Sequence, residues 1–162
     1  MVMSIRTRSL LVAAAAAAVV AASPLVLAHG AAGATSVPDC QPAHGLFDDH
    51  LVTPPPALTT EGRVLGSLHG DLHFALVNQT PSATPNVAFY DAQSSIHTDK
   101  GDLFFDEAGT TDSANGNFSV LQTITGGTGR YQGATGQLFA HGNFNFSTFQ
   151  GNGEYEGTVC TR

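Results

Sequence analysis

Three polar side chains occupy alternate positions in one segment: His69, Asp71 and His73. On a β-strand, side chains two positions apart lie on one face, about 6.6 Å from each other. Two such histidines can share a metal ion, but all three residues span roughly 13 Å, too far for one ion without a bulge. A metal site would also need His97 or His141 from a neighbouring strand. The alternation predicts that this register faces water, so His69 and His73 are weak metal candidates and we expect no cofactor.

Carboxylates form the second group of side chains that could do chemistry. Asp102, Asp106, Glu107 and the pair Tyr90-Asp91 are acid or base candidates if burial shifts their pKa values. Alternation along a strand puts Asp102 and Asp106 on one face and Glu107 on the other. Isolated carboxylates on strands are more often surface charges. The sequence therefore assigns no catalytic residue.

Residues 1–34 have the three-part pattern of a cleavable secretory signal peptide. Arg6 and Arg8 precede an apolar stretch, Leu10–Ala22, and small residues follow. Two cleavage points fit, after Ala28 and after Ala34, and we prefer the second. A Ser-Pro pair interrupts the apolar run, which argues against a stable membrane anchor. The pattern predicts a secreted, extracytoplasmic protein.

The predicted mature chain is strongly acidic. The whole sequence carries 6 Lys+Arg and 13 Asp+Glu, a formal net charge of −7. Arg6 and Arg8 leave with the signal peptide, so 4 basic and 13 acidic residues remain, a net charge of −9. Such a chain repels phosphate backbones, which argues against nucleic acid as a partner.

Cys40 and Cys160 are the only two cysteines, one near each end of the mature chain. In an oxidising compartment an even count indicates a disulfide. Such a bond would tie the N-terminal part of the mature chain to its last strand. Because it closes a long loop, it is worth roughly 4–5 kcal/mol in the chain-entropy model.

Two regions differ in composition after the signal peptide. Residues 35–60 are predicted to be a Pro-rich N-terminal arm, because proline fixes φ and lacks an N–H donor. Residues 61–162 have many glycines, alternating apolar and polar residues and no helical period, which predicts an all-β domain. The clearest strand runs from Val64 to Val77. Further strands are expected at 86–92, 95–98, 102–107, 117–125, 136–146 and 153–160.

These strands, with short connections and one apolar face, predict either a closed barrel or a sandwich. Periodicity alone does not separate the two. Aromatic side chains such as Phe74, Phe105 and Tyr155 are expected in the core, and a few could line a pocket for an apolar ligand.

The most distinctive segment runs from Ile124 to Gly136. It lacks the Gly-Lys-Ser/Thr ending of a phosphate loop, and its glycines do not have the dinucleotide-binding spacing. A tight glycine turn leading into Tyr131 would let that ring plug one end of a barrel, and later glycines permit a bend into the next strand. This reading of the segment is structural.

The same segment resembles the Gly-Gly-Thr-Gly-x-aromatic-x-x-Ala-x-Gly signature of the allene oxide cyclase-like and dirigent-like β-barrel family. The resemblance extends over residues 61–159. The matching positions are Gly126, Gly127, Thr128, Gly129, Tyr131, Gly133, Ala134 and Gly136.

This resemblance implies an antiparallel closed barrel of about eight strands with a small apolar lumen, often as a homotrimer. Family members cyclise an unstable fatty-acid epoxide or steer the coupling of phenoxy radicals. The matching motif contains none of their acid residues, so the catalytic residues stay unassigned. The cysteine pair and the predicted arm depart from the family pattern.

The leading functional hypothesis is an exported barrel that holds a small apolar ligand in its lumen, as an isomerase-like or coupling-directing container. The alternative is a non-enzymatic extracytoplasmic binding module or envelope-associated module on the same scaffold. A metal-binding protein is a third hypothesis, and it depends only on His69, His73 and a partner.

Overall fold

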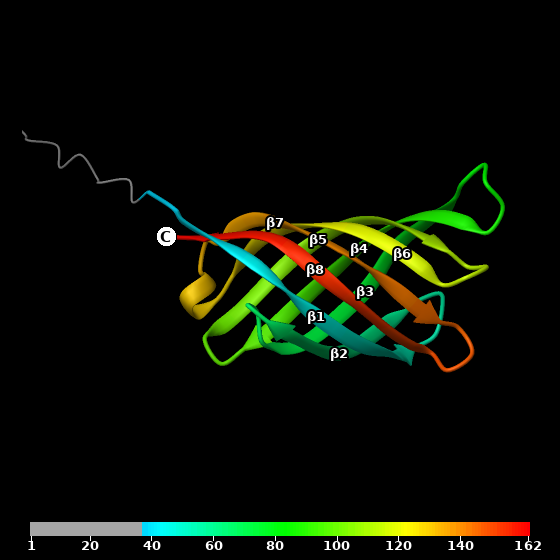
Figure 1. Cartoon of the computed structure of the whole chain (residues 1–162), viewed down its shortest axis with the longest axis horizontal. Coiled ribbons are helices and arrows are strands. Elements are labelled where there is room, and N and C mark those ends of the chain that lie inside the picture. Colours follow the sequence, from blue (N-terminus) through cyan, green and yellow to red (C-terminus); the bar gives the residue numbers. More distant parts are fainter. Residues whose placement is uncertain (1–36) are drawn as a thin grey trace, which may run out of the picture. The chain divides into compact units, whose positions relative to one another are not determined.

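The computed structural model describes residues 37–162, and these residues form one closed antiparallel β-barrel of eight strands (Figure 1). Each strand pairs with the next along the chain, and β1 pairs with β8 to close the barrel. The predicted all-β fold is confirmed, and the choice left open between barrel and sandwich is decided for the barrel. The elements are β1 (Asp39–Thr53), β2 (Thr59–Gly66), β3 (Gly70–Pro81), β4 (Val87–Thr98), β5 (Gly101–Asp112), β6 (Asn117–Gly127), the 3₁₀ turn η1 (Gly129–Tyr131), β7 (Thr135–Asn145) and β8 (Gln150–Thr161).

Strand β5 shows how alternation produces the barrel wall. Leu103, Phe105 and Glu107 are buried, while the residues between them are exposed. Successive side chains of a strand point to opposite faces of the sheet, so one register fills the inside of the barrel. The same alternation runs along the other strands.

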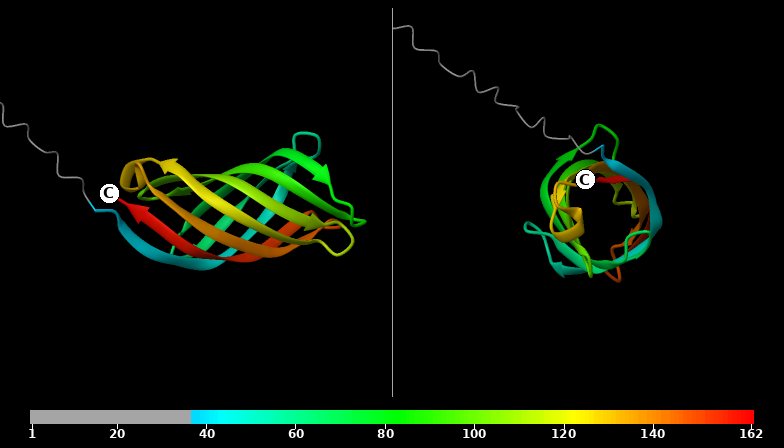
Figure 2. Two further views of the ribbon diagram at one scale, coloured as in Figure 1. Left: turned by 90° about the horizontal axis from the view of Figure 1, so that it is seen from above. Right: turned by 90° about the vertical axis from the view of Figure 1, so that its left-hand side faces the viewer.

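The two ends of the barrel differ. At one end lie η1, the C-terminus and the β2–β3 turn (Figures 1 and 2). Most of the core cluster comes from the strand halves nearest this end, including Leu68, Leu103 and Val159, and Tyr131 of η1 packs against the cluster. At the opposite end, the mouth, lie the turns between β1 and β2, β3 and β4, β5 and β6, and β7 and β8.

The predicted arm, residues 35–60, is wrong for most of its length. Asp39–Thr53 is strand β1, which pairs with both β2 and β8. Pro42 lies in β1 and is exposed, and Pro54, Pro55 and Pro56 follow the strand in the turn to β2. Proline is tolerated there because these positions do not need an N–H donor in the ladder.

Two predicted strand boundaries also change. The segment from Val64 to Val77 is a hairpin, because β2 ends at Gly66 and β3 begins at Gly70. The hydroxyl of Tyr155 holds this turn: it accepts a hydrogen bond from the Leu68 N–H at 2.9 Å. The expected strands 86–92 and 95–98 are one strand, β4.

The expected signal peptide, residues 1–34, lies outside the residues that the structure describes. Within residues 37–162, no helix has the length and apolar character needed to cross a membrane.

Candidate functional site

A cavity of about 600 Å³ lies inside the barrel and opens towards the mouth. Every strand contributes to its wall, because each turns one register inwards. Its wall is mainly aromatic and aliphatic, and a few polar side chains interrupt it. The lining residues are Phe47, Asp49, Pro55, Pro56, Leu58, Thr60, Val64, Leu72, Phe74, Leu76, Val77, Asn78, Gln79, Tyr90, Ile96, Glu107, Thr111, Ser113, Phe118, Val120, Gln122, Leu138, Ala140, Phe144, Phe146 and Tyr155.

The aromatic side chains of the wall support one another across strands. Phe74 and Tyr90 meet edge to face with ring centroids 6.2 Å apart. Phe47 and Phe118 lie 6.1 Å apart in a tilted pair. Such pairs are favourable and fix ring orientations, so the wall is largely preformed.

Glu107 of β5 is the most buried acid of the cavity, with 6% of its surface exposed. The Ser94 hydroxyl donates a hydrogen bond to its Oε1, and Gln122 Nε2 donates to the same oxygen at 2.7 Å. Both of these hydrogen bonds end on Oε1. Within residues 37–162, no fully buried side-chain nitrogen or oxygen lacks a partner, so the unbonded Oε2 is not fully buried and reaches the open space of the cavity. Burial raises the pKa of the Glu107 carboxyl, and the charge of Asp49 raises it further.

Asp49 of β1 is the second acid of the cavity. Thr60 Oγ1 donates a hydrogen bond to its Oδ2 at 2.5 Å, and the backbone N–H of Gly151 donates a further one. Burial raises the pKa of this carboxyl despite both hydrogen bonds. Burial also raises the pKa of the Tyr90 phenol, and the charges of Glu107 and Asp49 raise it further, so the phenol stays neutral.

The structure separates the predicted acid candidates. Glu107 faces the cavity, on the opposite side of β5 from Asp106 as alternation indicated, whereas Asp91 and Asp106 are exposed on the outer surface. Asp102 Oδ1 lies 2.9 Å from His97 Nδ1, and this contact lowers the pKa of the Asp102 carboxyl. Tyr90 lines the cavity although Asp91, its neighbour, does not.

Sequence reasoning missed Asp49, together with its partner Thr60. Both fell in the segment predicted to be an arm. A signal was present, since Ala43, Phe47 and Asp49 share one alternating register of β1. The prolines on either side of this segment led to the prediction of an arm instead of a strand.

The residues proposed for a metal do not form a site. His69 lies in the β2–β3 turn and His73 in β3, and both are exposed. His97 pairs with Asp102, and His141 Nε2 lies 2.9 Å from Glu154 Oε1. In the part of the chain that the structure describes, no group of three or more His, Cys, Asp or Glu side chains is arranged to hold a metal ion.

The glycine-rich segment forms the connection from β6 through η1 to β7. A Cβ on Gly127 would lie 2.2 Å from the Asp102 carbonyl oxygen, so only glycine fits that close approach. Gly133 has a positive φ of 69°, which favours glycine although a Cβ there meets open space. Half-buried Tyr131 lies between these glycines and packs on the core. The segment does not line the cavity.

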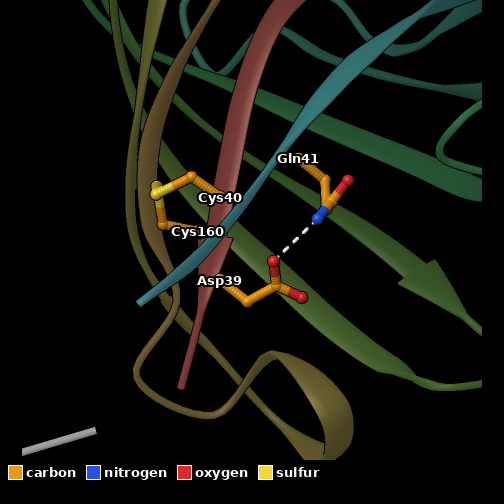
Figure 3. Close-up of a disulfide and its surroundings, with 4 residues drawn as sticks. All are labelled: Asp39, Cys40, Gln41 and Cys160. Carbon is orange, nitrogen blue, oxygen red and sulfur yellow. Dashed lines mark hydrogen bonds between the residues drawn. A yellow bond between two sulfur atoms is a disulfide. The ribbon is translucent and has the colours of Figure 1, made fainter. Parts of the chain in front are cut away.

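The predicted disulfide is confirmed. Cys40 of β1 and Cys160 of β8 are directly paired in the ladder and joined by an S–S bond of 2.04 Å (Figure 3). Beside it, Gln41 Nε2 donates a hydrogen bond to Asp39 at 2.7 Å (Figure 3). The bond joins the first and last strands, where the barrel closes.

Fold and cavity together define the class of protein: a closed antiparallel β-barrel with an internal, ligand-sized cavity that contains one buried acid, Glu107, and one half-buried acid, Asp49. The sequence matches no protein-family model and has no significant match among curated proteins. The resemblance to the allene oxide cyclase-like and dirigent-like barrels therefore stays a prediction.

Proposed function

We propose that this chain is an exported β-barrel protein that holds a small, largely apolar ligand in its lumen. The observation that carries the proposal is the cavity of about 600 Å³ with aromatic walls and a few polar groups. Small-molecule sites in proteins have this size and this kind of lining. The resemblance to the allene oxide cyclase-like and dirigent-like family supports the same reading.

Export is supported by two features of the chain. The signal-peptide pattern precedes the barrel, and the barrel has a disulfide between Cys40 and Cys160. Disulfides of this kind persist in oxidising compartments and are rare in the cytosol. Detection of the mature chain outside the cytoplasm, with an N-terminus near residue 35, tests this part of the proposal.

Ligand binding is tested by native mass spectrometry of protein purified from its own host, followed by a variant that fills the lumen. Thr111 lines the cavity, whereas the preceding residue, Thr110, faces outwards. Thr111→Trp is expected to lose the co-purifying ligand, and Thr110→Trp is the matched control that retains it. Equal ligand content in both folded variants would show that the lumen is not the site.

Catalysis on the bound guest is the second candidate function, and Glu107 favours it. A buried carboxyl with a raised pKa and an oxygen open to the cavity is suited to proton transfer. This role would make the barrel an isomerase-like container. The non-enzymatic binding or envelope-associated module uses the same cavity without turnover.

The two candidates differ in the fate of the ligand. The compound identified by mass spectrometry is incubated with fresh protein and its conversion followed by chromatography. For an isomerase-like protein, Glu107→Gln is expected to retain binding and slow conversion by about 10²–10⁴-fold. Conversion at the same rate in wild type and variant would show that Glu107 takes no part in catalysis. If wild type converts none of the compound, the protein is a non-enzymatic binding module.

A homotrimer is the assembly that the family resemblance implies. Phe89, Leu121 and Phe139 are exposed on the outer face of β4, β6 and β7 and line one shallow groove. Adjacent apolar side chains of this kind support burial of the face between copies of the chain. Sedimentation velocity is expected to give a trimer for wild type and a monomer for Leu121→Lys. A monomeric wild type at all concentrations would contradict the proposal.

A further inference from the structure

We infer that the guest of the lumen is an organic cation, a protonated amine being the simplest case, whose charged end binds to Glu107 while its apolar remainder extends along the aromatic walls. The inference rests on the proposed ligand-binding function and adds the charge of the ligand. Its basis is the presence of two acids, buried Glu107 and half-buried Asp49, on a cavity wall that has no basic side chain.

The charges that face the cavity have one sign only. Among the lining residues of the described chain there is no Lys, Arg or His. The titratable groups are Asp49 of β1, Tyr90 of β4, Glu107 of β5 and Tyr155 of β8. Each of these is either neutral or negative. His50, which lies outside the lining, lowers the pKa of Asp49, but no basic side chain acts on Glu107, so the protein supplies no cation to balance its carboxylate. A cationic guest supplies the missing charge.

The hydrogen bonds around the two acids have a common direction. Ser94 and Gln122 donate to Glu107, and Thr60 and the Gly151 N–H donate to Asp49. The surroundings therefore supply only donors to both carboxyls, which lets each be held in its ionised form when a cation binds. Both described bonds to Glu107 end on Oε1, so Oε2 keeps its lone pairs for a donor from the guest. An ammonium group is such a donor, and its bond to a carboxylate is charge-assisted.

The wall of the cavity also suits a cation. Phe47, Phe74, Tyr90 and Phe118 present aromatic rings to the same space as the two acids. Aromatic faces attract ammonium groups, most strongly when water is excluded. The alkyl or aryl remainder of the guest gains from burial against the same rings and against Leu72.

Burial favours the protonated form of both carboxyls in the empty cavity. The charge of Asp49 adds to this effect at Glu107; at Asp49 the charge of Asp48 adds to it and that of His50 opposes it. A bound ammonium reverses this preference, because it stabilises the carboxylate form. Affinity for the amine falls as the pH falls through the raised carboxyl pKa values. An anionic guest, by contrast, would meet two acids and no countercharge.

Three probes of equal length and different charge test the inference: octylamine, octanol and octanoate. Their affinities for the full mature protein are measured by isothermal titration calorimetry at neutral pH. Octylamine is expected to bind at least about tenfold more tightly than octanol, and octanoate most weakly. In Glu107→Gln the amine and the alcohol should bind with similar affinity. Glu156→Gln, which removes an exposed acid from the outer wall, is the matched control and should keep the preference.

The outcomes separate the two proposals. Octanol binding as tightly as octylamine to wild type would overturn the inference and leave the ligand-binding function standing. No binding of any probe to wild type would overturn the ligand-binding function itself. If Glu107→Gln fails to fold, titration of wild type at a series of acidic pH values decides: an affinity for octylamine that falls as the pH falls, while that for octanol does not, supports the inference, and the same pH dependence for both probes overturns it.

Discussion

At the scale of single residues, Glu107 links the cavity to the stability of the fold. Its carboxyl is buried without a basic partner, and burial raises its pKa above the ordinary value of 4.5. The folded chain therefore binds this proton more tightly than the unfolded chain. Below the ordinary pKa the carboxyl is protonated in both the folded and the unfolded chain, and the contribution of Glu107 to stability is fully present. It is lost as the pH rises through the raised pKa.

Glu107→Gln is predicted to remove this loss of stability. The amide oxygen can accept the same hydrogen bonds from Ser94 and Gln122, but the side chain cannot ionise. We expect the free energy of unfolding of the variant, relative to wild type, to rise as the pH increases above the ordinary glutamate pKa of 4.5. Urea unfolding at a series of pH values measures this difference.

Asp102→Asn is the contrasting control for that experiment. The hydrogen bond with His97 lowers the pKa of Asp102, so the contribution of this carboxylate is present above its unfolded pKa and is lost as the pH falls. The stability of this variant relative to wild type should therefore fall, not rise, across the acidic range as the pH increases.

Parallel stability curves for wild type and Glu107→Gln would contradict the assigned burial of Glu107.

At the scale of elements, the β2–β3 hairpin depends on a residue from a distant strand. The Tyr155 hydroxyl accepts from the Leu68 N–H at 2.9 Å and donates to the Leu68 carbonyl at 3.2 Å. Tyr155→Phe leaves these buried backbone groups without the partner, so we expect a loss of about 1–3 kcal/mol in the free energy of unfolding. Hydrogen exchange at the Leu68 amide should accelerate more than elsewhere in the barrel.

Tyr131→Phe is the matched control for the hairpin. Within residues 37–162 the Tyr131 hydroxyl makes no described hydrogen bond, and its half-buried ring packs against the core cluster that contains Tyr155. Removal of the Tyr131 hydroxyl should change the free energy of unfolding by only a few tenths of a kcal/mol. Equal exchange rates at Leu68 in wild type and Tyr155→Phe would refute the clamping role of Tyr155.

The β6–β7 connection is predicted to require glycine at one position for space. Gly127→Ala would put a Cβ 2.2 Å from the Asp102 carbonyl oxygen and 2.8 Å from the Tyr131 Cβ. Because both neighbours are backbone or near it, the strands must shift, and we expect a loss of about 1–3 kcal/mol. Gly133→Ala meets open space and should cost only the strain of its positive φ, about 1–2 kcal/mol. Thermal unfolding of both variants tests the order of the two losses.

The elements that sequence alone predicted are those whose signal is local. Alternation over 102–107 identified β5 and put Glu107 on the opposite face from Asp102 and Asp106, because side chains of a strand alternate between its two faces. The same signal failed for β1, where prolines interrupt it and the ladder partners, β2 and β8, are distant in sequence. The same signal also concealed the turn at Ser67, because the apolar register continues on both sides of that turn and predicts one unbroken strand.

At the scale of the whole molecule, the cavity was beyond reach of the sequence for a different reason. Whether an inner register fills the barrel or leaves a lumen depends on how side chains from all eight strands meet across it. Asp49 and Glu107 are separated by 58 positions in the chain and meet in one cavity only when the ring of strands closes. The resemblance to a barrel family predicted a lumen, but not its acids.

The disulfide acts at this same scale, because it joins the first strand to the last across 120 residues. In the folded state β1 and β8 pair along most of their length with or without the bond. Its main effect is therefore on the unfolded chain, whose entropy it restricts. The double variant Cys40→Ser/Cys160→Ser is predicted to form the same barrel with a free energy of unfolding lower by about 2–5 kcal/mol.

Wild type in reductant provides the second arm of this experiment. Because Cys40 is exposed, a reductant can reach the bond without prior unfolding. Reduced wild type and the double variant should then unfold at the same denaturant concentration, below that of oxidised wild type, while circular dichroism still reports a β-barrel. If reduction, verified by thiol titration, leaves the unfolding midpoint unchanged, the ladder between β1 and β8 holds the barrel closed by itself, and the disulfide contributes nothing to stability.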